Sequence, residues 1–304
     1  MNKEILLENL ATLELKASSS RFHKLFTTPY KYIHALAFRE LVYKRKRKEK
    51  KVIADSFFGV KMELLLPSST DIYLLGGKSH LSEIRLAKFM VNNIQSGQTF
   101  VDVGAHYGYF TLLCSTLVDV SGRVYAFEAA PKSYNILLEN TQSILNTESF
   151  NLAVSDNNTE LIFYEFPNLY SEYNTIYPDQ FKDEDWITSY PPKKVAVDSI
   201  TLDDFFMENS IVPDMIKIDV EGAEQLVING SLKYLVQHAP LIIMEYLEES
   251  RANSEHKLAE TKLNALGYHA HRIDPSGEIK ILKSASKYLE ENNLDSDNIV
   301  FKKI

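Results

Sequence analysis

The sequence predicts an α/β fold with a mostly parallel sheet covered by helices on both faces. The first observation is a strand, a glycine turn and a helix over residues 99–110, with Gly104 and Gly108 in the turn. The second is that short apolar runs alternate with segments of helical period from residue 81 to the C-terminus, as in repeated βα units. The third is that 304 residues with 45% hydrophobic content suffice for one large domain and a smaller appendage.

The N-terminal part predicts helices followed by a β-hairpin. Leu6, Leu10 and Leu13 have the spacing of one helix face, and a second helix is predicted over residues 29–42. Residues 52–66 alternate like two strands joined by a turn. We therefore expect a small accessory region that docks on the main body or on a partner.

Residues 44–51 form a basic run in which seven of eight residues are lysine or arginine. Such a run is typical of a targeting signal, of a nucleic-acid-binding patch, or of a cationic face that contacts phosphate head groups or an acidic glycan. A solvated helix end, whose positive charge suits the C-terminal helix dipole, explains the run equally well. The sequence leaves these alternatives open.

The remaining residues predict the elements of the main domain in order. Seven strands are predicted at residues 100–103, 124–127, 150–154, 215–219, 241–245, 268–273 and 299–302. Helices are predicted at residues 80–94, 110–117, 134–145, 202–206, 223–235 and 258–266. The alternation predicts a mostly parallel sheet, and the last two strands are expected to form an antiparallel hairpin.

These elements divide the chain into an accessory region, residues 1–77, and a main domain, residues 78–304. Within the main domain, residues 164–192 hold eight aromatic side chains among prolines and acidic residues and show little periodicity. Aromatic rings beside a cleft can stack on sugar rings or apolar acceptors, which predicts a substrate lid. A loop that packs its own aromatics on the surface is the alternative.

The bulk properties exclude several classes of protein. The net charge of −8 and the isoelectric point near 5.6 argue against a general nucleic-acid or anionic-membrane binder, although residues 44–51 reverse that sign locally. The single cysteine, Cys114, lies in a predicted helix, so no disulfide framework is expected and a buried role is favoured. No apolar stretch is long enough to span a bilayer and no signal pattern begins the chain, so a cytoplasmic protein is predicted.

The glycine turn is the first candidate binding element. Gly104 and Gly108 let the backbone approach a ligand closely, and the helix that follows offers unpaired N–H groups. The spacing is not the G-x-G-x-x-G of pyrophosphate-binding turns. Glu128 ends the second strand 24 residues after Gly104, near the offset at which an acidic residue accepts hydrogen bonds from a ribose hydroxyl pair.

Acidic residues follow several strands of the predicted sheet. Asp102, Asp219 with Glu221, and Glu245 all lie where strands end, and the carboxyl ends of parallel strands meet at one crevice. We therefore expect a strongly acidic crevice, which suits a cationic ligand.

The residues of this crevice carry a resemblance to a known family. Val-Asp-Val-Gly-Ala-His-Tyr-Gly-Tyr-Phe at residues 101–110 resembles motif I of the class I S-adenosylmethionine (SAM) methyltransferases in its FkbM-family form. The likeness continues at residues 127–128, 153–156, 202–204, 216–224, 229–230 and 243–245, so it covers residue 81 to the C-terminus. Ala129-Ala130-Pro131 departs from the family, which more often has a proline directly after the glutamate.

The resemblance implies a Rossmann-like class I methyltransferase sheet and a SAM site. The residues implied to bind SAM are Asp102, Gly104, Ala105, His106, Tyr107, Gly108, Glu128, Ser155, Asp156, Asp219 and Glu83. Ser155 and Asp156 are implied to meet the adenine ring and Glu83 to lie at the pocket rim. A surface turn after Ser155 and an exposed helix charge at Glu83 are the alternatives.

Methyl transfer to a hydroxyl requires alignment and removal of a proton. Asp219 or Glu221 is the first choice of base, because both follow an apolar strand into the crevice, with Glu245 and His106 in reserve. Asp219 and Glu245 could also hold a Mg²⁺ ion that binds a substrate diol, but the sequence completes no ligand set and a metal-free site is favoured.

The predicted function is SAM-dependent O-methylation, and the resemblance implies a hydroxyl of a sugar, a glycan or a secondary metabolite as acceptor. One rival is RNA methylation through residues 44–51, which would make RNA affinity depend on salt; we expect no specific nucleic-acid partner. Another is a scaffold protein that keeps the fold without catalysis. The sequence predicts no oligomeric state.

Overall fold

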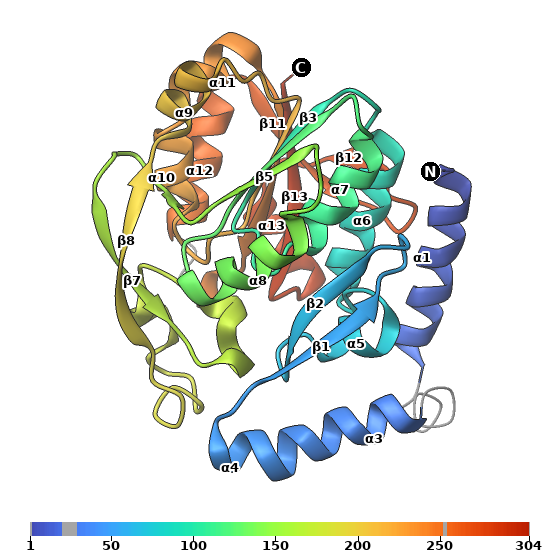
Figure 1. Cartoon of the computed structure of the whole chain (residues 1–304). Helices are drawn as coiled ribbons and strands as arrows, with labels where there is room; N and C mark the ends of the chain where they lie inside the picture. The colour runs from blue at the N-terminus through green and yellow to red at the C-terminus, as the bar shows by residue number, and fades with distance from the viewer. Residues whose placement is uncertain (1, 20–28, 252–253, 304) are drawn as a thin grey trace.

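The computed structural model describes residues 2–19, 29–251 and 254–303. An eight-stranded sheet lies at the centre, with strand order β12-β11-β13-β10-β9-β3-β4-β5 (Figure 1). Its strands are β3 (Thr99–Val103), β4 (Arg123–Phe127), β5 (Thr147–Phe150), β9 (Met215–Ile218), β10 (Leu241–Leu247), β11 (Tyr268–Ile273), β12 (Ile279–Ile281) and β13 (Ser296–Lys303).

Five neighbouring strands, β10, β9, β3, β4 and β5, run parallel, whereas β13 pairs antiparallel with β10 and β11. The predicted α/β class and the antiparallel end of the sheet are confirmed. The sheet has one strand more than the seven predicted, because the short β12 pairs with β11. The third strand was predicted at residues 150–154, but the sheet strand β5 ends at Phe150.

Residues 153–154 instead form β6 (Ala153–Val154) of a second, three-stranded sheet with order β6-β8-β7. Its other strands are β7 (Glu160–Glu165) and β8 (Lys193–Ile200). The segment between β7 and β8 holds two short 3₁₀-helices, η2 (Asn168–Tyr173) and η3 (Pro178–Phe181), and is the predicted aromatic insertion.

Helices cover both faces of the central sheet. They are α6 (Leu81–Asn93), α7 (Tyr109–Val118), α8 (Pro131–Thr141), α9 (Leu202–Asn209), α10 (Glu224–Asn229), α11 (Leu232–His238), α12 (Ser254–Ala265) and α13 (Ala285–Asn292), with the 3₁₀-turn η4 (Glu249–Arg251). Alternate residues of β3 enter different cores, because successive side chains of a strand point to opposite faces. Phe100 belongs to the core with α6 and α7, and Val101 and Val103 to the core with α9, α10, α12 and α13.

The N-terminal region packs on the first of these cores (Figure 1). It comprises α1 (Lys3–Ser18), α3 (Pro29–Ala37), the π-helical turn η1 (Phe38–Tyr43), α4 (Lys44–Lys46), the hairpin β1 (Lys50–Asp55) and β2 (Lys61–Leu66), and α5 (Thr70–Leu75). Leu6, Leu10 and Leu13 are buried, and Lys3 Nζ donates a hydrogen bond to the carbonyl of Ile94 at the end of α6. The predicted amphipathic helix is confirmed, apart from residue 1, which lies outside the described residues.

The aromatic insertion packs largely on itself. Tyr170 stacks on Trp186 with ring centroids 4.0 Å apart, and Phe166, Phe181 and Tyr190 pack around this pair. Most of these rings therefore pack against one another, as the alternative of a self-packed loop predicted. None of the helices among the described residues has the length and apolar character needed to cross a bilayer.

We expect that Leu10→Ala lowers the free energy of unfolding by about 2–5 kcal/mol, because it leaves a cavity where α1 meets α6. Leu15→Ala, at an exposed position of the same helix, should change it by less than about 0.5 kcal/mol. Denaturant unfolding followed by circular dichroism measures both. Equal stability of the two variants would contradict the burial of α1 in this core.

Candidate active site

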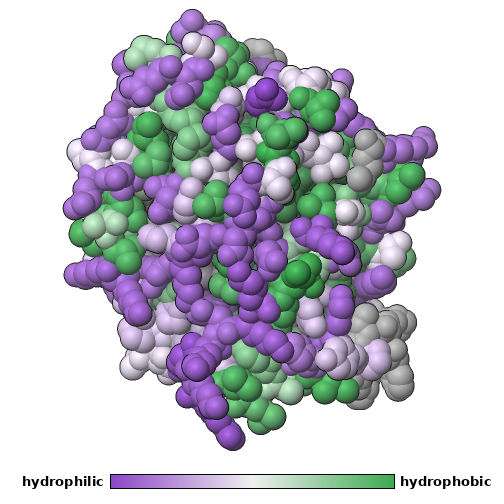
Figure 2. All heavy atoms as spheres, viewed as in Figure 1, coloured by the Kyte–Doolittle hydropathy of each residue, from purple (hydrophilic) through white to green (hydrophobic). Residues whose placement is uncertain are grey.

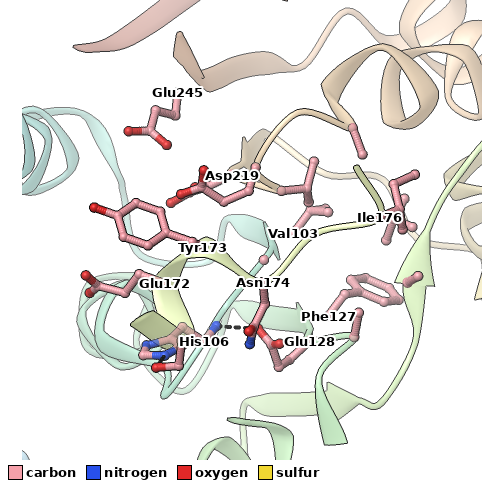
Figure 3. A pocket seen from close by; sticks show the side chains of 18 of the residues that line it. Val103, His106, Phe127, Glu128, Glu172, Tyr173, Asn174, Ile176, Asp219 and Glu245 are labelled. Carbon is pink, nitrogen blue, oxygen red and sulfur yellow. Dashed lines mark hydrogen bonds between the residues drawn. The ribbon is translucent and has the colours of Figure 1, made fainter. Parts of the chain in front are cut away.

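The carboxyl ends of the parallel strands open into a cavity of about 400 Å³ (Figure 3). The loop after β3 enters this cavity at Gly104, whose φ is +80°. A Cβ atom at Gly104 would lie 1.7 Å from the carbonyl oxygen of Asp219, so only glycine fits where β3 and β9 end side by side. Glycine is therefore required at this position by the backbone of the neighbouring strand end, whereas the sequence had predicted it for close approach of a ligand.

Glu128 lies at the end of β4 and lines the cavity. Its carboxylate accepts hydrogen bonds from the backbone N–H groups of His106, at 2.7 Å, and Ala130, at 2.9 Å. Burial raises the pKa of Glu128 to about 7, although these two N–H groups act in the opposite direction. The carboxylate is therefore fixed in orientation and titrates near neutral pH.

Lys217 connects the ends of two neighbouring strands. Its ammonium lies 3.5 Å from a carboxylate oxygen of Asp102 on β3 and 3.1 Å from one of Asp219, just after β9. Burial alone would lower the pKa of Lys217, but the two carboxylates raise it above the ordinary value. Burial acts to raise the pKa of Asp219, and Lys217 more than offsets it, so Asp219 is ionised.

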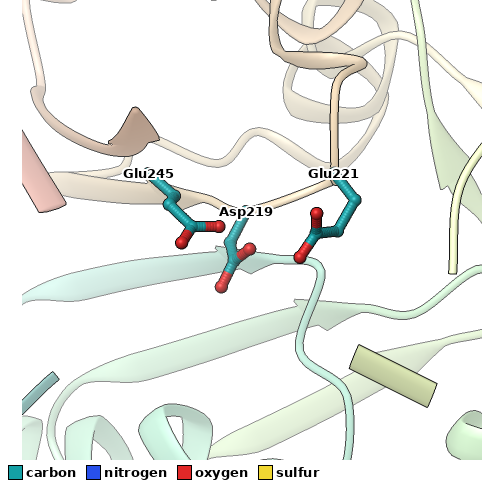
Figure 4. Close-up of side chains that lie close together, drawn as sticks. All are labelled: Asp219, Glu221 and Glu245. Carbon is teal, nitrogen blue, oxygen red and sulfur yellow. The ribbon is translucent and has the colours of Figure 1, made fainter. Parts of the chain in front are cut away.

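Three carboxylates converge on one wall of the cavity (Figure 4). One oxygen each of Asp219, Glu221 and Glu245 lies within 4.8 Å of the others. Burial and the neighbouring acidic charges raise the pKa of Glu245 to about 8 and that of Glu221 well above its ordinary value. Arg251 of η4 lies 3.9 Å from Glu221. This acid trio can share protons, receive a proton from a ligand, or supply oxygen ligands to a divalent cation.

A second charged cluster closes the cavity from the side of the insertion. Lys78, ahead of α6, forms an ion pair with Glu172 of η2 and lies 3.2 Å from Glu83. Burial raises the pKa of Glu83 to about 7, and Lys78 holds that of Glu172 below its ordinary value against the effect of burial. His106 lies 3.0 Å from the hydroxyl of Ser171, and burial lowers its pKa to about 4. His106 is therefore neutral near pH 7.

The residues predicted for the site divide into two groups in the structure. Those that line the cavity are Glu83, Gly104, His106, Glu128, Ser155, Asp219, Glu221 and Glu245. Those that do not are Asp102, Ala105, Tyr107, Gly108 and Asp156.

The residues away from the cavity wall mostly support it. Asp102 accepts a hydrogen bond from Thr111 at 2.6 Å, which fixes the start of α7. The hydroxyl of Tyr107 accepts one from Asn168 of the insertion at 2.8 Å, and Gly108 begins α7 in the left-handed region. Asp156 is exposed, which matches the alternative of a surface turn after Ser155.

Sequence reasoning missed several residues that line the cavity. They include the polar or aromatic residues Lys78, Glu172, Tyr173, Asn174, Arg251 and Asn298. Glu172 and Tyr173 lie in the predicted lid, so the acidic and aromatic character of that segment was a usable signal. Lys78, Arg251 and Asn298 carry no local signal, because chain segments far apart bring them together. Glu224 is buried, and one of its carboxylate oxygens lies 3.1 Å from the Nε2 atom of His256.

The two ends of the cavity differ in character. Figure 3 shows Glu172, Tyr173, Asp219 and Glu245 on one side and Phe127 with Ile176 on the other. Leu152, Ala153, Val154, Leu161 and Phe163 add to the apolar end. The buried hydroxyl of Ser155 at this end has no hydrogen-bond partner among the described residues. The cavity at the carboxyl ends of the parallel strands thus has an acidic end and an apolar end.

Comparison with known proteins identifies the family. The methyltransferase FkbM domain matches residues 102–270, which is 169 of 304 residues. The chain therefore belongs to the FkbM methyltransferase family and is a SAM-dependent methyltransferase. None of the curated proteins compared with the chain matches it.

Several solved structures are similar to this chain. They include the methyltransferase FkbM from Methylobacillus flagellatus KT, with 14% identity, a TM-score of 0.41 and coverage of 97% of this chain and 58% of that chain. Fibrillarin from Aeropyrum pernix in complex with SAM has 12% identity, a TM-score of 0.39 and coverage of 72% and 74%. A SAM-dependent O-methyltransferase from Thermotoga maritima has 12% identity, a TM-score of 0.39 and coverage of 83% and 77%.

The residues present fit SAM. The backbone of Gly104 lines the cavity, and the fixed carboxylate of Glu128 suits a hydroxyl pair. The apolar end with the unpartnered Ser155 hydroxyl suits an adenine ring, which has both an apolar face and polar edges. The acid end suits the sulfonium and ammonium charges of the cofactor.

We expect the affinity for SAM to rise between pH 6 and pH 8. Glu128 has a pKa of about 7 and accepts hydroxyl hydrogen bonds best above it, when ionised. The pKa of Glu83 is also about 7, so the pH profile of the wild type does not assign the effect to one residue. The Glu128→Gln variant makes that assignment. This variant should weaken binding about 10- to 100-fold at pH 8, the equivalent of one charged hydrogen bond, and flatten the pH profile.

Isothermal titration calorimetry with SAM measures this effect. Glu148→Gln, at an exposed glutamate on β5, is the matched control and should bind like the wild type. A Glu128→Gln variant with unchanged affinity would contradict the placement of a cofactor hydroxyl pair at this carboxylate.

Proposed function

We propose that this enzyme transfers the methyl group of SAM to a hydroxyl oxygen of a sugar, a glycan or a secondary metabolite. The observation that supports the proposal most is the acid trio on the cavity wall (Figure 4). A hydroxyl must lose its proton as its oxygen is methylated, and a carboxyl group with a pKa near the working pH is suited to take it. Glu245, with a pKa of about 8, meets this requirement.

The bound cofactor supplies an electrophilic methyl group. Asp219, kept ionised by Lys217, places a fixed negative charge beside the position of the transferred group. Glu245 takes the proton of the acceptor hydroxyl, with Glu221 as the second candidate. Asp219, the first choice from the sequence together with Glu221, is a weaker base because Lys217 lowers its pKa. His106 is held by Ser171 and serves to shape the cavity wall.

The insertion side of the cavity supports a polyhydroxylated acceptor. Tyr173 offers a ring face, Asn174 an amide, and Arg251 a guanidinium within the same wall. Carboxylates accept hydrogen bonds from sugar hydroxyls, whereas the amide and the guanidinium donate to them. Ring-shaped acceptors with several hydroxyls therefore match the groups that this wall offers.

The structure gives less support to the two rival functions. None of residues 44–51 lines the cavity, so the basic run does not extend the site toward an RNA substrate. The scaffold alternative would permit a filled or disrupted cavity. Gly104, Glu128 and Asp219 instead surround an open one, which supports a catalytic role.

The decisive experiment is incubation of the protein with methyl-labelled SAM and a panel of sugars, glycolipids, hydroxylated metabolites and RNA, followed by mass analysis. We expect a gain of one methyl group on an acceptor oxygen. Methylation of RNA alone, or absence of SAM binding by the wild type, would contradict the proposal.

We expect Glu245→Gln to lower kcat by about 10²- to 10⁴-fold, because the proton of the acceptor loses its base. The Kd for SAM should change by less than about twofold, since the variant keeps the shape of the side chain. Glu290→Gln, at an exposed glutamate of α13, is the control. If kcat equals that of the wild type, Glu221 rather than Glu245 is the base. The variant Glu221→Gln then tests this role.

We expect dialysis against EDTA to leave kcat unchanged, with no gain on addition of Mg²⁺. Lys217 already lies 3.1 Å from Asp219 and Arg251 3.9 Å from Glu221, so cationic side chains compensate part of the acidic charge. This agrees with the metal-free site favoured by the sequence. Activity lost with EDTA and restored by Mg²⁺ would assign a divalent cation to the acid trio.

A further inference from the structure

An exposed apolar stripe runs along one edge of the molecule, away from the cavity. The helical segment 29–46, formed by α3, η1 and α4, lies at the lower edge of Figure 1. Four large apolar side chains point to solvent from it, with exposed fractions of 80% for Tyr30, 57% for Ile33, 44% for Leu36 and 58% for Leu41. On the opposite side, Ala35 and Tyr43 are buried against the rest of the protein.

A basic cluster continues this stripe. Lys44, Arg45, Lys46 and Lys48 are all exposed. Of these, Arg45, Lys46 and Lys48 form no ion pair with any residue that the structure describes. Residues 29–50 hold eight basic and two acidic residues, a net charge of +6 in a chain whose total is −8. Figure 2 shows hydrophobic and hydrophilic atoms side by side on this lower edge.

Residues 29–50 contain two acidic residues, Glu40 and Glu49, and neither neutralises the basic cluster. Glu40 lies within 2.9 Å of Arg39 and also pairs with Lys44, and Glu49 forms an ion pair with Lys132 of α8. Both acidic charges are therefore compensated locally. The outward charge of the helical segment is positive.

The stripe is held in one orientation. Tyr43 accepts a hydrogen bond from the backbone N–H of Leu169 at 3.1 Å, and Arg47 lies over the ring of Tyr190 at 3.6 Å. Arg47 also donates to the carbonyl of Ser189 at 3.2 Å. These contacts fix the C-terminal end of the segment on the aromatic insertion, so the apolar stripe and the basic cluster face outward together.

We propose that residues 29–48 bind an anionic lipid bilayer, with the apolar stripe in the headgroup and acyl boundary and the basic cluster at the lipid phosphates. A helix with an apolar face beside exposed lysine and arginine residues has the features of a helix that lies in the membrane interface. A second copy of this chain is a poor occupant, because two segments of charge +6 would repel each other. This proposal is independent of the proposed methyl transfer.

The test is co-sedimentation of the full chain with vesicles of phosphatidylcholine, with or without about one third phosphatidylglycerol. We expect binding to the anionic vesicles, little binding to pure phosphatidylcholine, and release on addition of salt. The charge-reversed variant Arg45→Glu/Lys46→Glu/Lys48→Glu should lose at least about tenfold in vesicle affinity. The same net change at exposed lysines elsewhere, Lys283→Glu/Lys287→Glu/Lys302→Glu, should leave affinity within about threefold of the wild type.

The apolar stripe has its own test. Ile33→Ser/Leu41→Ser should weaken vesicle binding at least about fivefold, because less apolar surface enters the interface. Leu145→Ser/Val212→Ser, at apolar positions that are also exposed, is the matched control and should bind like the wild type. Circular dichroism and SAM binding verify that each variant is folded.

Three outcomes would overturn the proposal. The first is wild-type protein that stays in the supernatant with anionic vesicles. The second is Ile33→Ser/Leu41→Ser protein that binds vesicles as well as the wild type, which would refute insertion of the stripe. The third is self-association or RNA binding that depends on residues 29–48, observed together with no binding to vesicles.

Discussion

The site depends on one buried ion-pair arrangement, in which Lys217 lies between Asp102 and Asp219. A buried lysine is stable as a cation only if carboxylates compensate it, and each carboxylate here belongs to a different strand or strand end. The arrangement links β3 to β9 at the point where Gly104 passes the carbonyl of Asp219. It also leaves Asp102 free to accept from Thr111 and so position α7. The ion pairs of Lys217 and the close approach of Gly104 to Asp219 therefore both hold the end of β3 against the end of β9.

The distribution of charge around the cavity follows from this balance. Asp219 is ionised because it faces Lys217, whereas Glu245 and Glu221, which face Asp219 and each other, have raised pKa values. One wall thus combines the ionised Asp219 with Glu245, whose pKa is about 8, and with Glu221, whose pKa is also raised. The insertion adds Glu172 and Tyr173 to the same side of the cavity, and Lys78 holds the insertion against α6 through Glu172 and Glu83. The ion pairs that hold the insertion against α6 therefore also contribute to the charge around the cavity.

The sequence predicted the fold class and the lining residues that follow strands. Gly104, Glu128, Asp219 and Glu245 were found because strand ends and turn glycines leave a local pattern. The prediction was wrong where a pattern had two structural outcomes. Residues 150–154 form an apolar run, but pairing with β8 draws Ala153 and Val154 into a separate sheet, and β5 ends at Phe150. Asp102, which the resemblance implied to bind the cofactor, is buried beside Lys217 and does not line the cavity.

The amino-acid sequence by itself determined the alternation of strands and helices, the glycine turn and the positions of acidic residues at strand ends, because each depends on neighbours within a few residues. Only the tertiary structure decided which of these residues meet in the cavity and what their pKa values are. Lys78, Glu172 and Arg251 reach the site from three distant segments, and no local pattern encodes that contact. Likewise, the sequence predicted a helix over residues 29–42, and packing decided that Ile33, Leu36 and Leu41 of this helix point to solvent.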